Sequence, residues 1–324
     1  MNLSSLVATL SAELHGDEHW RTGVIYRSTL HSVCTFGGTT LLLNEVFSTS
    51  FLVRYEAHLL GRGCFRNTTS FYLRALRAMY NKAVQRGWAT PISGLFDQVF
   101  TGNDPTEKRA LSPDTLFHIL EVELSDDKIL ERTRDLFALT FFLHGMPFID
   151  LIYLRKDNVR QNAVVYYRRK TRKTITVPLD EQTRKLLAKY ADSSDSPYFF
   201  PYITEEGEAG RKQYENLLHN QNWNLKRLAQ TLGITEKLTT YVSRHTWATI
   251  AYHSGVELPV ISQAMGHQNQ EVTRVYLAEF RNEVLRRAGE MVIQAIYGTK
   301  KRKENKGTTG KKKYPSPCKR RTFV

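Results

Sequence analysis

Cysteine is scarce in this 324-residue chain, and the few cysteines present stand far apart. Cys34, Cys64 and Cys318 show no CxxC spacing, which excludes a disulfide framework and a cysteine-rich zinc site. We therefore expect no metal ion and a reducing, cytoplasmic location.

Long apolar runs are also missing. No stretch approaches the roughly 18 apolar residues that a membrane span needs. The first twenty residues, MNLSSLVATLSAELHGDEHW, lack the basic start and the apolar segment of a secretory signal. Neither secretion nor membrane contact is expected, and the length favours two domains, each with its own core.

Negative charge is in short supply, with 32 acidic residues against 46 Lys and Arg and a net charge of +14. The excess is concentrated in the segment from Lys300 to Val324, which holds eleven basic residues and one acidic residue, a net of +10. Its composition predicts a disordered tail with affinity for a polyanion such as nucleic acid. A purely solubilising tail is the alternative.

Residues 1–100 show helical periodicity. The segment FSTSFLVRYEAHLLGRG has apolar residues at helical spacing and ends at Gly61 or Gly63. The next segment, NTTSFYLRALRAMYNKAVQRGW, has Asn67 and Thr68 as cap candidates and ends before Gly87. On this second helix Arg74 and Arg77 fall outside the apolar stripe and form either a solvated face or a phosphate-binding face.

The polar segment 101–110, TGNDPTEKRA, is typical of an interdomain linker. A new helix follows, with Ser112 as N-cap and Pro113 in its first turn. Strand-like runs from Val164 to Arg168 and from Thr174 to Val177 then predict a hairpin around a basic turn. Further helical segments follow, the last running from about Val272 to Tyr297. The fold class is therefore mainly α, or α+β, with one small antiparallel sheet.

The segment TTYVSRHTWATIAYHSGVELPVISQAMGHQNQEVTRVYL resembles the carboxy-terminal signature of the tyrosine recombinase, or phage integrase, family. Upstream, HGMPFIDLIYLRKDNV resembles the first family box, and RRKTRKTITVPL resembles the hairpin that bears the catalytic lysine. The resemblance implies a helical core-binding domain over residues 1–100, a linker over 101–110 and a catalytic domain over 111–298. Residues 299–324 form the basic tail.

The resemblance also implies roles for four residues. Tyr276 attacks the scissile phosphate and forms a 3′-phosphotyrosyl link, which needs neither metal nor cofactor. Arg244 stabilises the charge of the transition state, and His267 hydrogen-bonds a non-bridging oxygen. Lys170 protonates the leaving 5′-oxygen. Each residue taken alone has a commoner structural explanation, such as a packed helix tyrosine, but their joint order and spacing favour catalysis.

The chain departs from the family pattern at two positions. Pro147 stands where the first box usually has an arginine, and Tyr241 stands where the second box usually has a histidine. Asp150 keeps the acidic position of the first box and is expected to have a structural role. We predict that His144 or Arg155 partly replaces the missing arginine.

The resemblance predicts a site-specific recombinase that integrates, excises or inverts DNA, as part of a mobile element. Its partner is double-stranded DNA with paired core sites, on which it forms a homotetramer, while the free protein is a monomer or weak dimer. Accessory DNA-bending proteins and a nucleoid location are also expected. A DNA-binding protein that has lost its chemistry and a type IB topoisomerase are the alternatives. The residues expected to contact DNA are Arg74, Arg77, Arg169, Arg172 and Lys173.

Overall fold

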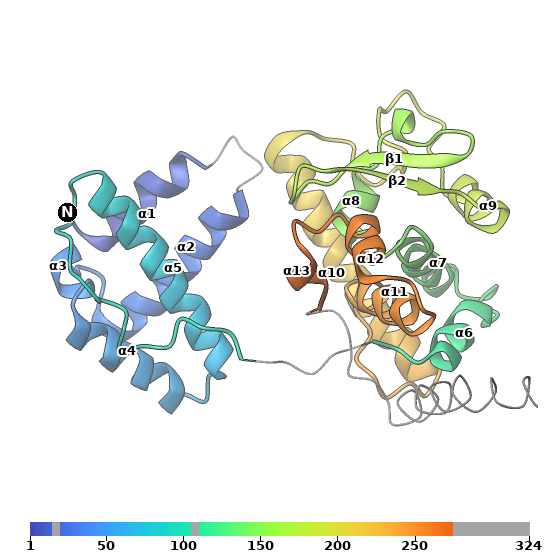
Figure 1. Cartoon of the computed structure of the whole chain (residues 1–324). Helices are drawn as coiled ribbons and strands as arrows, with labels where there is room; N and C mark the ends of the chain where they lie inside the picture. Colours follow the sequence, from blue (N-terminus) through green and yellow to red (C-terminus); the bar gives the residue numbers. More distant parts are fainter. Residues whose placement is uncertain (15–19, 105–109, 275–324) are drawn as a thin grey trace, which may run out of the picture.

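The computed structural model describes residues 1–14, 20–104 and 110–274. Figure 1 shows the described elements in two groups, with α1–α5 in one and α6–α13 together with the two strands in the other. One hydrophobic cluster draws on residues 3–99, and three further clusters draw on residues 111–265. The expected mainly helical fold with a small antiparallel sheet is confirmed. The exact domain boundaries stay a prediction.

The first group is built from five helices whose apolar faces share one core. The predicted helix ending at Gly61 is confirmed, because α4 ends there and buries Phe51, Leu52, Tyr55 and Leu59. The helices of this group are α1 (Leu3–Ala12), α2 (Trp20–Gly37), α3 (Leu43–Val46), α4 (Thr49–Gly61) and α5 (Arg66–Gln85).

The start of α5 differs from the expectation that Asn67 or Thr68 caps it. The helix begins at Arg66, and its N-cap residue, Phe65, makes no side-chain cap. Asn67 lies inside the helix, and its side chain instead exchanges two hydrogen bonds with the backbone of Asp104, at 2.7 and 2.9 Å. A tertiary contact has therefore replaced the local one, and Asn67 fixes the chain where it leaves this group.

The second group surrounds α7, which packs against α6, α9, α10 and α11. The predicted N-cap of α6 is confirmed, since Ser112 Oγ accepts a hydrogen bond from the Thr115 amide at 3.0 Å. The helices of this group are α6 (Pro113–Glu121), α7 (Lys128–Phe142), α8 (Phe148–Ile152), η1 (Lys156–Asn158), α9 (Glu181–Lys189), α10 (Gly207–Thr231), α11 (Val242–His253), α12 (Leu258–Ala264) and α13 (Gln270–Arg274).

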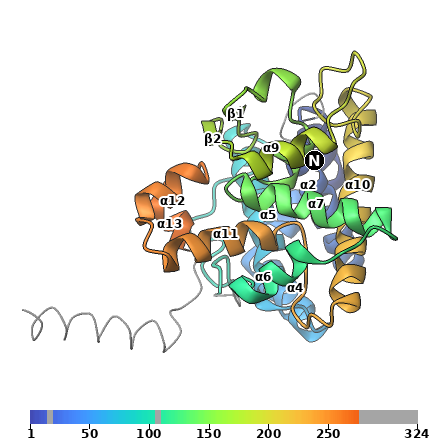
Figure 2. The same ribbon diagram turned by 90° about the vertical axis from the view of Figure 1, so that its right-hand side faces the viewer.

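The predicted hairpin is confirmed as β1 (Ala163–Tyr167) paired antiparallel with β2 (Thr174–Pro178). Alternate residues of both strands are buried, with Val164 and Tyr166 facing the core from β1. The turn between the strands reaches toward α12, which also contacts β2. In Figure 2, α12 and α13 lie at one end of α11, so the hairpin and these three helices meet at one edge of the group.

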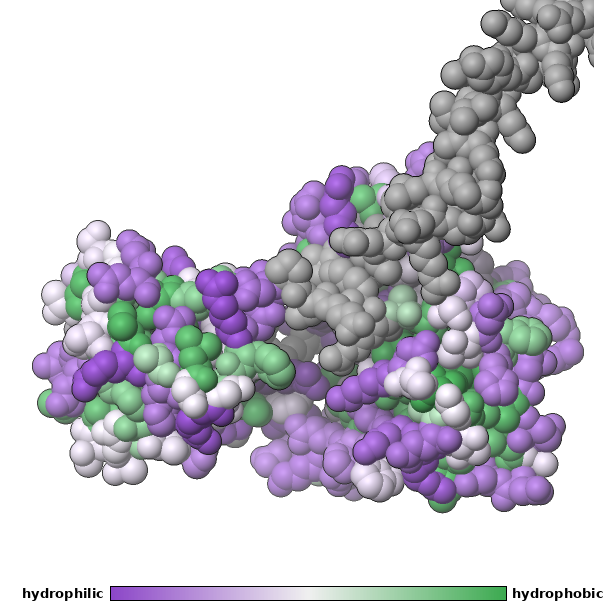
Figure 3. Space-filling model, turned by 90° about the horizontal axis from the view of Figure 1, so that it is seen from below, coloured by the Kyte–Doolittle hydropathy of each residue, from purple (hydrophilic) through white to green (hydrophobic). Residues whose placement is uncertain are grey.

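The predicted long helix from about Val272 is described only as far as Arg274, within α13, and the basic tail lies outside the described residues. Among the described residues, no helix is both long and apolar enough to cross a membrane. On the face shown in Figure 3, hydrophilic residues are spread over both groups, with smaller apolar areas between them.

Candidate active site

The side chain of Arg244 lies at the centre of the edge where the hairpin meets the three helices. It sits in the first turn of α11 and is only 1% exposed. Its Nη1 donates to the carbonyl of Gly145 at 2.6 Å, and its Nη2 donates to the carbonyl of Met265 at 2.7 Å. Because two backbone oxygens hold this guanidinium, its direction is fixed before any substrate binds.

Gly145 makes this arrangement possible. Its φ is +67°, a left-handed conformation, and a Cβ added to it would lie 3.1 Å from the Cα of Arg244. Both the backbone conformation and the close approach therefore require glycine.

His267 is the second buried member of the site and is 3% exposed. Arg244 Nη2 lies 2.9 Å from its Nε2, and Thr273 Oγ1 lies 2.7 Å from its Nδ1. A guanidinium can only donate, so Nε2 accepts and the imidazole proton is on Nδ1, from which it is donated to Thr273. Burial is the largest cause that lowers the pKa of His267, and the positive charges of Arg244, Arg168 and two hairpin lysines lower it further, to about 3. The imidazole is therefore neutral at physiological pH.

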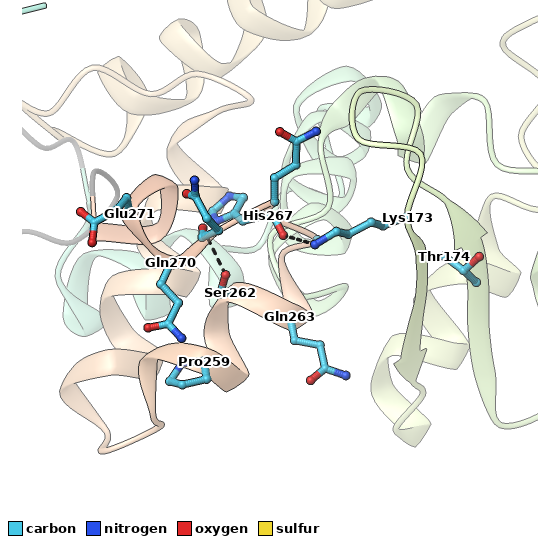
Figure 4. Close-up of a pocket in the computed structure, with 11 residues that line it drawn as sticks. Lys173, Thr174, Pro259, Ser262, Gln263, His267, Gln270 and Glu271 are labelled. Carbon is cyan, nitrogen blue, oxygen red and sulfur yellow. Dashed lines mark hydrogen bonds between the residues drawn. The ribbon is translucent and has the colours of Figure 1, made fainter.

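The hairpin holds the turn that carries His267. Arg168 and Thr171 both donate to the carbonyl of Gly266, the threonine at 3.0 Å, and Lys173 donates to the carbonyl of His267. In Figure 4 the Lys173 side chain extends from the hairpin to this carbonyl. These contacts fix the distance between the hairpin and the histidine.

Lys170 occupies the exposed turn between β1 and β2. Its charge is near enough to lower the pKa of His267. The structure thus brings Lys170, Arg244 and His267, three of the four predicted catalytic residues, to one place. A groove lies beside them, and its lining includes Lys173, His267 and amide side chains such as Gln263 and Gln270 (Figure 4).

Asp150, the acidic residue of the first box, is buried in α8 beneath the hairpin. Its Oδ1 accepts a hydrogen bond from the Arg169 amide at 3.2 Å. Burial raises its pKa to about 6, against the opposing effects of that hydrogen bond and of the nearby arginine charges. Its contact with the hairpin backbone agrees with the structural role expected for it.

The two residues predicted to replace the missing arginine lie in different settings. Pro147 is the residue before α8. His144, three positions earlier, is half-buried and stacks on Trp247 with ring centroids 4.9 Å apart. Burial lowers the pKa of His144, so it is neutral at physiological pH. Arg155 is largely exposed and lies 3.8 Å from Asp157.

Tyr241 is the residue immediately before α11, three positions ahead of Arg244. It is 49% exposed, and the edge of its ring contacts His245 at a centroid distance of 5.0 Å.

The residues predicted to contact DNA fall into two sets. Arg74 and Arg77 are exposed on α5, whereas Arg169, Arg172 and Lys173 belong to the hairpin. The Arg169 guanidinium lies over the ring of Tyr153, 4.5 Å from its centroid. Arg172 has a φ of +59° in the turn. Of the hairpin set, Lys173 contacts His267, whereas the α5 set belongs to the other group of helices.

Tyr276, the predicted nucleophile, lies outside the described residues. The last described helix nevertheless leads from the site, because Thr273 is fully buried against His267.

Arg168 and Thr273 were missed by the sequence reasoning. The strand pattern contained a signal for Arg168, since Val164 and Tyr166 face inward and position 168 follows in the same period of two. For Thr273 the sequence offers no such signal. Among the described residues, no cluster of His, Cys, Asp and Glu could hold a metal ion.

Two family models match the chain. The phage integrase family model covers residues 111–283, just over half of the chain, and the phage integrase SAM-like domain model covers residues 2–91. Among curated relatives, tyrosine recombinase XerA of Thermococcus kodakarensis is 28% identical over 76% of this chain and 83% of its own length. Tyrosine recombinase XerD of Rhizobium meliloti is 25% identical over 68% of this chain and 73% of its own length.

Solved structures share the fold. The Tn1549 transposon integrase in complex with a circular intermediate DNA has a TM-score of 0.64 at 15% identity, covering 90% of this chain and 99% of that one. A lambda integrase dimer bound to a COC′ core site has a TM-score of 0.60 at 14% identity, covering 85% and 77%. At such identities the likeness concerns the fold alone.

Proposed function

Because the chain belongs to the phage integrase family and is a tyrosine-type site-specific DNA recombinase, we propose that Tyr276, Arg244, His267 and Lys170 perform its chemistry. The observation that carries these assignments is the contact of Arg244 with His267 beside the Lys170 turn. Thr273 touches the same histidine, and the three residues from there to Tyr276 span at most about 11 Å. Tyr276 is thus within reach of the phosphate that Arg244 and His267 would hold.

Each bond change has a residue assigned to it. The phenolic oxygen of Tyr276 attacks the scissile phosphorus, its proton passes to solvent, and the bond from phosphorus to the 5′-oxygen breaks. Lys170 donates a proton to that oxygen, leaving a 5′-hydroxyl and a 3′-phosphotyrosyl link. The phosphate bond energy is kept in the link, so a second 5′-hydroxyl can reverse the step and join a new strand.

Arg244 and His267 stabilise the pentacoordinate transition state. The planar guanidinium of Arg244 donates to two phosphate oxygens and, being held by backbone carbonyls, needs little reorganisation. A phosphate in the site raises the pKa of His267 by adding a negative charge among the cations. The imidazole then gains a proton on Nε2, gives up the hydrogen bond from Arg244 and donates a hydrogen bond to a non-bridging oxygen.

Tyr241 and Asp150 complete the arrangement. Tyr241, in the position of the usual histidine, donates its hydroxyl to the phosphate at the start of α11. Asp150 holds the hairpin through the Arg169 amide, which keeps Lys170 in place.

The remaining proposals concern the DNA complex. Double-stranded DNA with paired core sites lies between the two groups of helices, with the α5 arginines and the hairpin cations on its phosphates. Four protomers assemble on two sites, coupled through the segment after Arg274, and accessory DNA-bending proteins assist them in the cytoplasm. The protein serves a mobile element.

Truncation before Phe280 should leave single-site binding intact and abolish synaptic complexes in a gel-shift assay, whereas normal synapsis would refute this coupling.

The covalent step is tested with a nicked suicide substrate, whose short released strand diffuses away. The binding site is first obtained by selecting bound duplexes from a random-sequence pool. Wild type should form a protein–DNA adduct that survives boiling detergent, with chelator present. Tyr276→Phe should bind the site and form no adduct, while Tyr198→Phe, a change of the same size away from the site, should behave as wild type. An adduct formed by Tyr276→Phe would remove Tyr276 from the role, and binding without any adduct in wild type would favour a DNA-binding protein.

A further inference from the structure

Arg168 is a buried arginine directly after the last residue of β1. It is 5% exposed, although arginine is almost never buried without compensating contacts. The strand alternation that buries Val164 and Tyr166 turns Arg168 inward, whereas the following Arg169 and Lys170 are exposed. The fold therefore directs one positive charge of this basic hairpin into the interior.

The contacts of Arg168 place it beside Arg244. Its Nη1 donates to the carbonyls of Met265 and Gly266, the first at 2.7 Å. Arg244 Nη2 donates to the same Met265 oxygen, also at 2.7 Å, and to His267 Nε2. Two guanidinium groups thus share one acceptor, on the turn that carries the catalytic histidine.

The local packing is built around the Arg168 stem. A Cβ added to Gly266 would lie 3.1 Å from Arg168 Cδ and 2.4 Å from Ile175 Cδ1. A side chain at position 266 would displace the arginine, so this glycine lets the Arg168 stem approach the turn closely. Gly266 therefore allows the close approach of Arg168, in the same way that Gly145 allows the close approach of Arg244.

The site lacks a cation where this family usually has one. Position 147 is proline, His144 is neutral and stacked on Trp247, and Arg155 is exposed near Asp157. Among the described residues, Arg168 is the arginine that shares an acceptor with Arg244.

We propose that Arg168 is a catalytic residue of this recombinase and donates, with Arg244, to the non-bridging oxygens of the scissile phosphate. The inference rests on the proposed function. A guanidinium has five N–H donors, so each arginine can keep backbone carbonyls as anchors while it also donates to a phosphate oxygen, and charge-assisted hydrogen bonds are the stronger ones. The second arginine of the site thus comes from the hairpin, two residues before the general acid Lys170, instead of from the first box.

The test compares two suicide substrates in single-turnover cleavage by the full chain. One carries the natural scissile phosphate, and the other carries a methylphosphonate, in which a methyl group replaces one non-bridging oxygen and removes the charge. Release of the 5′-hydroxyl strand is measured for wild type, Arg168→Ala and the control Arg184→Ala. Arg184 is an exposed arginine of α9 beside Glu181, outside the site.

On the phosphate substrate, Arg168→Ala should cleave about a hundredfold more slowly than wild type, as expected for loss of one preorganised donor, with unchanged site affinity. On the methylphosphonate substrate it should cleave within a few-fold of wild type, because the charge that Arg168 neutralises is no longer present. Arg184→Ala should match wild type on both substrates.

An equal loss on both substrates would show that Arg168 only supports the structure, and full activity of Arg168→Ala on the phosphate would also overturn the proposal. The failure of the proposed function has a different signature. In that case wild type would release no strand from either substrate, or Tyr276→Phe would still form an adduct.

Discussion

At the scale of single residues, the site depends on backbone positions as much as on its charged side chains. Arg244 is held by the carbonyls of Gly145 and Met265, and Arg168 by those of Met265 and Gly266. Both glycines have positive φ and allow an arginine to approach closely. The preorganisation that phosphate chemistry needs is therefore built into two short turns.

Gly145→Ala tests this preorganisation. The added methyl group meets Arg244 and strains a left-handed residue, so we expect about 1–3 kcal/mol of destabilisation in urea unfolding. Single-turnover cleavage should also slow strongly, with site binding retained. Gly255→Ala is the matched control, because Gly255 has a φ of +86° but nothing within 4 Å of its added Cβ. Equal effects of the two substitutions on cleavage would show that the close approach to Arg244 is unimportant.

His267 should make stability depend on pH. Its pKa is about 3 in the fold, against 6.5 ordinarily, so between these values the unfolded chain binds the proton and the folded chain does not. The stability conferred by the neutral imidazole is complete above pH 6.5 and declines as pH falls. At pH 5 the loss is about 2 kcal/mol.

His267→Gln, which keeps an acceptor for Arg244, should therefore lose less stability than wild type between pH 7.5 and pH 5 in urea unfolding. Asp150 acts in the opposite direction, because its raised pKa of about 6 makes the folded chain bind a proton more readily than the unfolded chain. The comparison of variant with wild type cancels that contribution. Parallel pH profiles would contradict the assigned pKa of His267.

At the scale of elements, the sequence predicted those features that depend on local patterns. Ser112 and Pro113 indicated the start of α6, and alternation indicated the hairpin to within one residue. Asn67 was assigned wrongly because its polar side chain had two possible partners, the helix end and the Asp104 backbone, and only tertiary structure decides between them. The partners of Arg168 lie almost a hundred positions away, at Met265 and Gly266, so its place in the site could not follow from local pattern.

The hairpin should control the protonation of His267. Lys173 contributes a positive charge that lowers the pKa of this histidine and donates to its carbonyl. Lys173→Met should therefore raise the pKa of His267 toward its ordinary value, measured by NMR titration of the imidazole without DNA. Lys185→Met is the control, since Lys185 is exposed on α9 and pairs with Glu181 at 3.1 Å. An unchanged titration midpoint for Lys173→Met would show that the hairpin charge does not reach the site.

At the scale of the whole molecule, the positive charge is divided between a structured site and a terminal segment. Of the net +14, residues 300–324 supply +10, so the remainder of the chain carries only +4. The charges at Arg168, Arg244 and Lys170 are placed by the fold, and we propose that they act together on one phosphate. We expect the charges of residues 300–324 to bind phosphates of any DNA sequence, because counterion release depends on charge alone.

Deleting residues 300–324 should separate these two uses of charge. Loss of eleven basic side chains should weaken binding to nonspecific duplex DNA and make the logarithm of affinity much less dependent on salt, by about 0.9 for each phosphate that the tail no longer neutralises. Cleavage of the suicide substrate at saturating protein should persist, because every residue assigned to the chemistry lies before position 300.

Arg244→Ala should give the reciprocal result, since it removes the neutralisation of at most one phosphate but slows the chemical step. The two variants are compared by fluorescence anisotropy across a salt series and by single-turnover cleavage. Loss of cleavage at every concentration of the truncated protein would instead make residues 300–324 part of the active assembly, acting on the site itself or on the interface between protomers.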